Sequence, residues 1–231
     1  MAVLYTLFDF SDDRLSDKAT VIGLMQAIAQ EDHWQFLKKA IVCDDSPGEI
    51  YVPNTPQTIA GAWHNAIRAA PRYNGAYWME FQNAQGVQVN FGIDPKNYQR
   101  LNLTVDSAVF RGDTGAQTLE DYLAVAHTIY NHLQPAYGYG FFNYDMHMPY
   151  PSDSIPRAVW DVNYFGADYV ASLPANTFDA LDCAVCDPLP DGGVYLRVSA
   201  HPPQTATRDI GRYKAVAEKL GLNQIYVGGG L

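Results

Sequence analysis

Apolar and polar positions follow two different periods along the first part of the chain. Residues 2–10 place apolar side chains on both faces of an extended segment, which predicts a strand at the centre of a sheet. A helix is then expected from Ser16 or Asp17, either of which can cap its first turn, to about Gln30. Apolar residues recur at helical spacing within it: Val21, Leu24, Met25 and Ile28.

The next region changes from helical to strand-like spacing. A short strand is expected at 41–43, and a loop containing proline and glycine follows from Asp44 to Pro56. A short helix is expected from Thr58 to Ala70. Three successive strands then predict an antiparallel meander with one solvated face, at 76–81, 87–93 and 101–106.

The second half follows a linker, expected at 107–117, and again changes from helix to strands. The clearest helix of the chain is expected to open at Thr118 and to end at Pro135. Its apolar stripe consists of Leu119, Tyr122, Leu123, Ala126, Ile129, Tyr130 and Leu133. Later strands are expected at 137–144, 158–164, 181–185 and 193–198, and later helices at 167–173 and 210–220.

This order of elements predicts an α+β fold. The strands mostly adjoin one another, which favours a mostly antiparallel sheet, or sheets, with helices packed on one side. A length of 231 residues is sufficient for a single compact domain spanning 1–231. Both halves place a helix before strands, so two similar sub-halves, 1–110 and 117–231, are a further hypothesis.

Composition limits the classes of partner. The net charge is −10, and the 15 lysines and arginines are scattered rather than gathered in a patch. A protein with this net negative charge is repelled by nucleic acid and by anionic membrane surfaces, so a basic protein partner is favoured. No apolar run approaches the roughly 18 residues of a membrane span. Three cysteines argue against a disulfide framework and for a reducing compartment, which predicts a cytoplasmic location.

Cys183 and Cys186 have the C-x-x-C spacing of zinc and redox sites. A zinc site would need two further ligands, and the third cysteine, Cys43, is remote in sequence. The pair falls in an expected strand, where residues three apart face opposite ways, so the thiols are expected to lie apart. The motifs of P-loop nucleotide binding, serine hydrolases and zinc proteases are absent. The sequence therefore favours a non-enzymatic protein without a cofactor.

Two alternatives stay open. A small metal-dependent hydrolase could use Asp145, His147 and Asp153, because the first two would share one face of a strand. A small-molecule site could instead be formed by an aromatic pocket. Its lining would be Tyr137, Tyr139, Phe141 and Tyr144.

The segment from Ala158 to Val170 resembles a motif of bacterial immunity proteins from polymorphic-toxin and type VI secretion systems. Those families carry a tryptophan strand, an Asn-aromatic-Phe-Gly turn and an aromatic residue on a short helix. The most specific match is Asn163-Tyr164-Phe165-Gly166. The resemblance covers about residues 75–220, and it implies a cytoplasmic protein that binds and neutralises a cognate toxin without chemistry.

The residues of this motif have expected roles in the architecture. Trp160 is expected to fill the core, and Asn163 to cap the turn. Gly166 is expected to adopt a positive φ, which glycine permits without a steric penalty. The motif therefore bears on the fold more than on the partner.

An acidic and tyrosine-rich surface is the expected contact for a basic toxin. Acidic clusters steer a basic partner, because charge complementarity raises the association rate. The predicted contact residues are Asp44, Asp45, Glu49, Tyr144, Asp145 and Tyr150.

Overall fold

A computed structural model describes residues 3–29, 40–42, 77–82, 88–94, 100–110, 113, 115–143, 156–200, 209–222 and 224–225. Within these ranges nine strands form one antiparallel sheet, in the order β2-β3-β4-β5-β1-β6-β8-β10-β9. They are β1 (Val3–Asp9), β2 (Ala40–Val42), β3 (Tyr77–Gln82), β4 (Gln88–Asp94), β5 (Arg100–Asp106), β6 (Tyr137–Asn143), β8 (Val162–Phe165), β9 (Val185–Pro188) and β10 (Val194–Arg197). The expected α+β class and mostly antiparallel sheet are confirmed.

Helices and a small parallel pair of strands complete the described part of the fold. The helices are α1 (Lys18–Ala29), α3 (Gly115–Leu133), α4 (Ala167–Ser172) and α5 (Ile210–Lys219), with 3-10 turns η1 (Arg14–Ser16), η3 (Ser107–Phe110) and η4 (Phe178–Ala180). β7 (Ala158–Val159) and β11 (Gln224–Ile225) pair in parallel beside α5. None of the described helices has the length and apolar character needed to cross a membrane.

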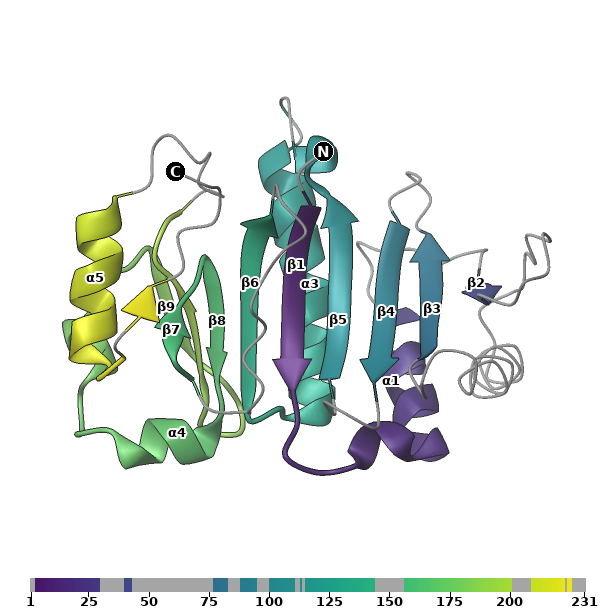
Figure 1. The fold of residues 1–231 in the computed structure, drawn as a ribbon, viewed down its shortest axis with the longest axis horizontal. Coiled ribbons are helices and arrows are strands. Elements are labelled where there is room, and N and C mark those ends of the chain that lie inside the picture. Colours follow the sequence, from purple (N-terminus) through teal and green to yellow (C-terminus); the bar gives the residue numbers. More distant parts are fainter. Residues whose placement is uncertain are drawn as a thin grey trace.

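β1 lies in the middle of the sheet, between β5 and β6 (Figure 1). Each residue from Val3 to Asp9 has a Cα partner in β5 and another in β6. Leu4 and Phe8 are fully buried on one face, and Leu7 is almost fully buried on the other. The expectation of a central strand that is apolar on both faces is confirmed.

α1 and α3 cover one face of the sheet and pack against each other. The apolar stripe expected on α3 is buried in this layer. The Tyr122 hydroxyl donates to the Leu103 carbonyl oxygen (3.0 Å) and lies 2.9 Å from the Thr6 hydroxyl oxygen, so its polar end is satisfied inside the core. At the start of α1, the Asp17 carboxylate accepts a hydrogen bond from the Thr20 amide (2.8 Å), which is the expected cap.

A second apolar layer lies on the opposite face, under α5. Tyr139 and Phe141 of β6 point to this face. The Tyr139 ring stacks on Trp160 with ring centroids 4.7 Å apart, and the Phe141 ring packs against Trp160 in a tilted arrangement at 5.1 Å. Tyr213 and Val216 bring α5 into the same layer. The expected packing of helices on one side holds for α1 and α3, whereas α5 packs on the other face, because β6 and β8 bury side chains on that face too.

The largest differences from the expected elements lie in the second half of the chain. α3 begins at Gly115, inside the expected linker. The expected strand at 158–164 divides into β7 and β8, because the Asn163 side chain accepts from the Trp160 amide (2.9 Å) and donates to the Trp160 carbonyl oxygen (2.9 Å). The expected strand at 181–185 is replaced by β9, which begins at the last of these residues. The roles expected for Asn163 and Trp160 are confirmed.

Gly166 does not have its expected conformation. Its φ is −66°, so the expected positive φ is wrong. Close approach requires the glycine instead, because a Cβ there would lie 2.7 Å from the Ala136 carbonyl oxygen and 2.9 Å from that of Pro135. The Gly166 amide also donates to the Ala136 carbonyl oxygen at 3.2 Å. This contact draws the start of α4 against the chain that leaves α3.

Gly138 gives a test of the packing around β1. A Cβ at this position would lie 2.7 Å from Cδ1 of the buried Phe8 ring and 3.1 Å from Cβ of Tyr164. We expect Gly138→Ala to lower the free energy of unfolding by about 1–3 kcal/mol through overpacking, measured by urea denaturation. Gly211→Ala is the control, because its Cβ would meet only the Asp209 carboxylate at 3.3 Å on an exposed helix. Equal midpoints for Gly138→Ala and the parent would show that this corner is loosely packed.

Candidate functional site

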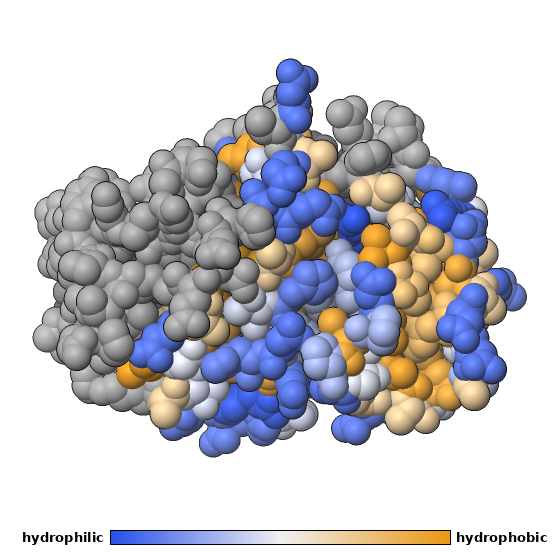
Figure 2. Space-filling view, turned by 180° about the vertical axis from the view of Figure 1, so that it is seen from behind, coloured by the Kyte–Doolittle hydropathy of each residue, from blue (hydrophilic) through white to orange (hydrophobic). Residues whose placement is uncertain are grey.

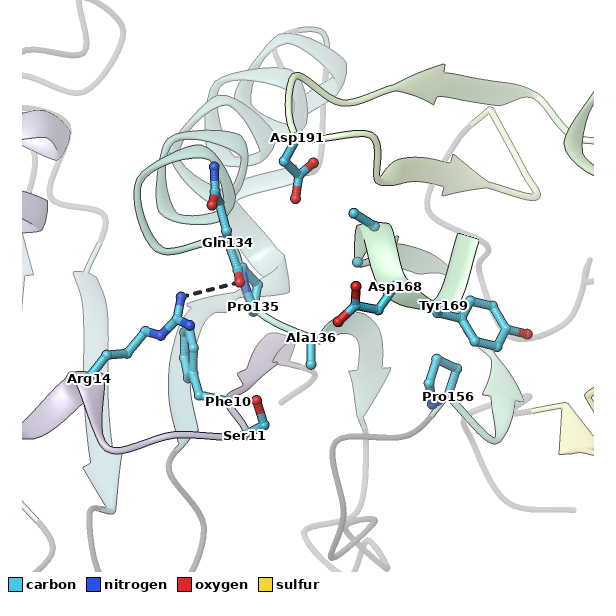
Figure 3. A pocket seen from close by; sticks show the side chains of 12 residues that line it. Phe10, Ser11, Arg14, Gln134, Pro135, Ala136, Pro156, Asp168, Tyr169 and Asp191 are labelled. Carbon is cyan, nitrogen blue, oxygen red and sulfur yellow. Dashed lines mark hydrogen bonds between the residues drawn. The ribbon is translucent and has the colours of Figure 1, made fainter. Parts of the chain in front are cut away.

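A pocket of about 490 Å³ lies where the end of α3, the segment before α1 and the start of α4 meet (Figure 3). Its walls include Phe10, Arg14, Gln134, Ala136, Asp168 and Asp191. Three regions far apart in sequence therefore supply the lining, together with the turn between β9 and β10. The volume falls in the range of small-ligand sites, which is roughly 300–1,000 Å³.

Asp191 is held at the rim of this pocket by two hydrogen bonds. Its Oδ1 accepts from the Gly193 amide and its Oδ2 from the Tyr130 hydroxyl, both at 2.9 Å. Burial raises the pKa of Tyr130, and the bonded Asp191 carboxylate raises it further, so the hydroxyl stays protonated as a donor. Both donors are neutral and leave the charge of Asp191 unbalanced. Figure 3 shows this carboxylate directed into the pocket.

Arg14 brings a positive charge to the opposite wall, but its guanidinium is already engaged. Its Nε and one terminal nitrogen donate to the Asp12 carboxylate at 2.7 and 2.6 Å. The other terminal nitrogen donates to the carbonyl oxygens of Leu133 and Gln134 at the end of α3 (Figure 3). The bond with Arg14 lowers the pKa of Asp12, and the bond with Asp12 raises the pKa of Arg14. Arg14 is thus a cross-link whose charge is balanced.

Asp168 projects into the pocket from the start of α4, on a wall separate from Asp191 (Figure 3). Among the described residues, neither aspartate forms an ion pair with a lysine or arginine. The sequence analysis did not identify this pair. A signal for it was present, because residues 158–196 contain six aspartates and no lysine or arginine.

The residues predicted to contact a partner lie outside the part of the chain that the structure describes. They are Asp44, Asp45, Glu49, Tyr144, Asp145 and Tyr150. His147 and Asp153, which the alternative metal site needs, also lie there. These assignments stay predictions. Within the described ranges, no three His, Cys, Asp or Glu side chains are arranged to hold a metal ion.

The aromatic strand forms core rather than a pocket in the described structure. Tyr137, Tyr139 and Phe141 are fully buried, and the rings of Tyr137 and Tyr139 stack at 5.2 Å. The Tyr137 hydroxyl donates to the Ala158 carbonyl oxygen at 3.0 Å. These three side chains therefore do not line a small-molecule site, and Tyr144 lies outside the described residues.

Cys183 and Cys186 are both free thiols. Cys183 Sγ lies 3.9 Å from the Leu181 carbonyl oxygen, and Cys186 Sγ lies 3.8 Å from that of Phe178. The expectation that the two side chains face opposite ways is wrong, because Cys183 precedes β9 and both side chains pack against the core under α5. Burial raises the pKa of both thiols, that of Cys186 to about 12. A raised thiol pKa is the opposite of what redox catalysis needs, because the thiolate is the nucleophile.

His127 lies on α3 in a cluster of aromatic rings. Its ring meets those of Tyr195 (4.4 Å) and Tyr164 (5.4 Å) edge-on. Burial lowers the pKa of His127 to about 4, although the charges of Asp187 and Glu120 act in the opposite direction. The imidazole is therefore neutral at physiological pH and belongs to the packing.

Apolar side chains gather on the side of the molecule that carries β8, β9 and β10 (Figure 2). Ala184 is exposed there, while Val185 and Leu189 are half-buried against the core under α3. β9 ends the sheet on this side, since no described strand pairs with its outer edge. Asp182 and Asp187 are exposed in the same stretch of chain, so an apolar surface adjoins acidic side chains.

Comparison with known proteins gives a likeness of fold. No protein-family model matches the chain, and no curated protein matches it. A solved structure of similar fold is the T6SS protein PA0821 of Pseudomonas aeruginosa, with a TM-score of 0.60. The match covers 100% of this chain and 76% of that chain at 10% sequence identity. At this identity the likeness shows the fold alone.

The half-buried thiols of Cys183 and Cys186 should react slowly in the folded protein. We expect iodoacetamide at pH 8 to alkylate Cys183 and Cys186 at least about ten-fold more slowly in the native chain than in urea, because little thiolate is present. Peptide mapping by mass spectrometry measures both rates, and glutathione in each buffer is the control. Native rates close to that of glutathione would contradict the raised pKa values.

Burial of His127 should make the protein less stable in acid. Its folded pKa of about 4 lies below the unfolded value near 6.5, so the unfolded chain takes up the proton first. The free energy of unfolding should be unaffected above pH 6.5 and should fall between pH 6.5 and 4, by at most about 3 kcal/mol. His127→Phe should remove this part of the pH dependence in urea titrations. An unchanged slope would show that the imidazole titrates freely in the fold.

Proposed function

We propose that the protein is a non-enzymatic binding protein of the immunity type, which binds a cognate protein toxin and neutralises it. The observation that carries this proposal is the apolar surface bordered by aspartates at the β9 edge of the sheet. The likeness of fold to a T6SS protein supports the same secretion-system setting. The proposed partner is basic, and the proposed location is cytoplasmic.

The surface at β9 has the composition of a recognition surface. Protein interfaces combine an apolar centre with a polar rim, and apolar patches on a protein surface often mark them. Here Ala184, Val185 and Leu189 are apolar and partly accessible, and Asp187 lies among them in sequence. The outer edge of β9, with which no described strand pairs, also offers backbone groups to a partner strand. Both features favour a protein partner over a small molecule.

The negative charge of the chain favours a positively charged partner. The chain carries −10 overall, and six of its aspartates fall in a stretch without any basic residue. A basic partner would be steered to such a protein, with an association rate that falls as salt rises. Asp44, Asp45, Glu49, Tyr144, Asp145 and Tyr150 are the proposed further contacts.

The test begins with the tagged full chain in its native lysate. We expect one basic protein to co-purify with the chain at equal stoichiometry. Expressed alone, the co-purified protein should inhibit growth, and co-expression of the two should relieve that inhibition. Association rates are then measured for Asp44→Lys/Asp45→Lys, which should bind at least about ten-fold more slowly because steering is reversed.

The control pair is Asp113→Lys/Glu218→Lys, which changes the net charge equally at exposed positions. Equal slowing in both pairs would assign the effect to net charge and reject the contact residues. A co-purified protein whose toxicity is not relieved by this chain would reject the immunity function.

A further inference from the structure

We propose that the pocket between Asp168 and Asp191 receives a guanidinium group, supplied by an arginine side chain of the protein partner. The source of the guanidinium rests on the proposed function, whereas the chemistry of the pocket does not. Three properties of the pocket support this proposal: its unbalanced charge, the direction of its acceptors and the contacts that hold its walls in place.

The charged side chains that line the pocket give it a net negative charge. Arg14 is the cation among the lining residues, and the Asp12 carboxylate binds it through two of its nitrogens. Among the described residues, no lysine or arginine pairs with Asp168 or Asp191, and the two groups that donate to Asp191 are a hydroxyl and a backbone amide, so both carboxylates stay unbalanced. A cationic ligand is the chemistry that restores neutrality here.

The acceptors favour a planar cation over a point charge. Asp168 and Asp191 project from different elements, so their carboxylates enter the pocket from separate walls (Figure 3). Each oxygen of Asp191 accepts one hydrogen bond and can accept a second. A guanidinium has five N–H donors in one plane and can bridge two such walls, which an ammonium does less well.

The walls are fixed before a ligand arrives. Tyr130 and Gly193 hold Asp191, and the close approach of Gly166 to Ala136 sets the spacing of α4 from α3. Phe10 is almost fully buried, and the Arg14 guanidinium lies over its ring, 5.6 Å from the ring centroid, which helps to hold the Arg14 wall in place. Because Asp191 is already held in place, a ligand that binds it incurs a smaller cost of ordering this side chain, and this favours affinity.

The decisive experiment titrates N-acetyl-L-arginine amide into the ¹⁵N-labelled full chain. We expect saturable shifts of the backbone amide signals of Asp168 and Gly193. The affinity obtained from these shifts should fall as the salt concentration rises. N-acetyl-L-citrulline amide has the same shape without the charge and should give no saturable shift. Asp168→Asn and Asp191→Asn should each weaken arginine amide binding about ten-fold, through loss of a charge-assisted hydrogen bond.

Asp179→Asn is the matched control, because it removes the same charge from an exposed position outside the lining. Asp168 is exposed, so its variant keeps the test valid if loss of the Asp191 contacts with Tyr130 disturbs folding. No saturable shift with the arginine probe, or equal binding of the citrulline probe, overturns the inference and leaves the proposed function intact.

A separate experiment distinguishes an arginine of a protein partner from a free guanidinium compound as the ligand. If the probe binds but no partner is neutralised, the proposed function fails, and a free guanidinium compound is the ligand. With an identified partner, Asp168→Asn should weaken the complex about ten-fold relative to Asp179→Asn. Equal affinity of the two variants for that partner would overturn the assignment to a partner's arginine.

Discussion

Burial of β1 on both faces is the constraint on which the rest of the structure depends. Leu4 and Phe8 need a layer under α1 and α3, and Leu7 needs a second layer on the other side. Each fully buried side chain of this size contributes about 1.5–3 kcal/mol. Because β1 pairs with β5 and with β6, it also joins strands from the early and late parts of the chain into one sheet. A helix on each face follows from this requirement.

The pocket is a consequence of how the elements around this sheet end. α3 stops at Leu133, and Gln134 takes a positive φ of 47°, which turns the chain toward β6. Arg14 links η1 to that same turn through a hydrogen bond to the Gln134 carbonyl oxygen. Gly166 brings the start of α4 against the next two residues, Pro135 and Ala136. These close contacts leave a gap between helix ends where Asp168 and Asp191 project. The residues that shape the gap therefore serve the fold, and the aspartates supply its charge.

The described structure separates residues that pack from residues that are open to a partner. The aromatic residues Tyr137, Tyr139 and Phe141 resemble functional groups in the sequence, yet they are buried, and the half-buried imidazole of His127 is neutral. The thiols of Cys183 and Cys186 have raised pKa values, unlike those of redox sites. The open features are the β9 edge with its apolar and acidic side chains, and the negatively charged pocket. Both suit recognition of a basic protein.

The sequence by itself determined the α+β class, the central position of β1, the stripe of α3 and the role of Asn163, because these depend on local periodicity and on contacts between near neighbours. It could not determine that Gly166 is needed for close approach, that both thiols pack against the same core, or that α5 covers the second face. The stretch 158–196, with six aspartates and no lysine or arginine, indicated negative charge, but it could not show that Arg14 is neutralised while Asp168 and Asp191 are not. Those properties depend on atoms from segments far apart in the chain, and only the tertiary structure brings them together.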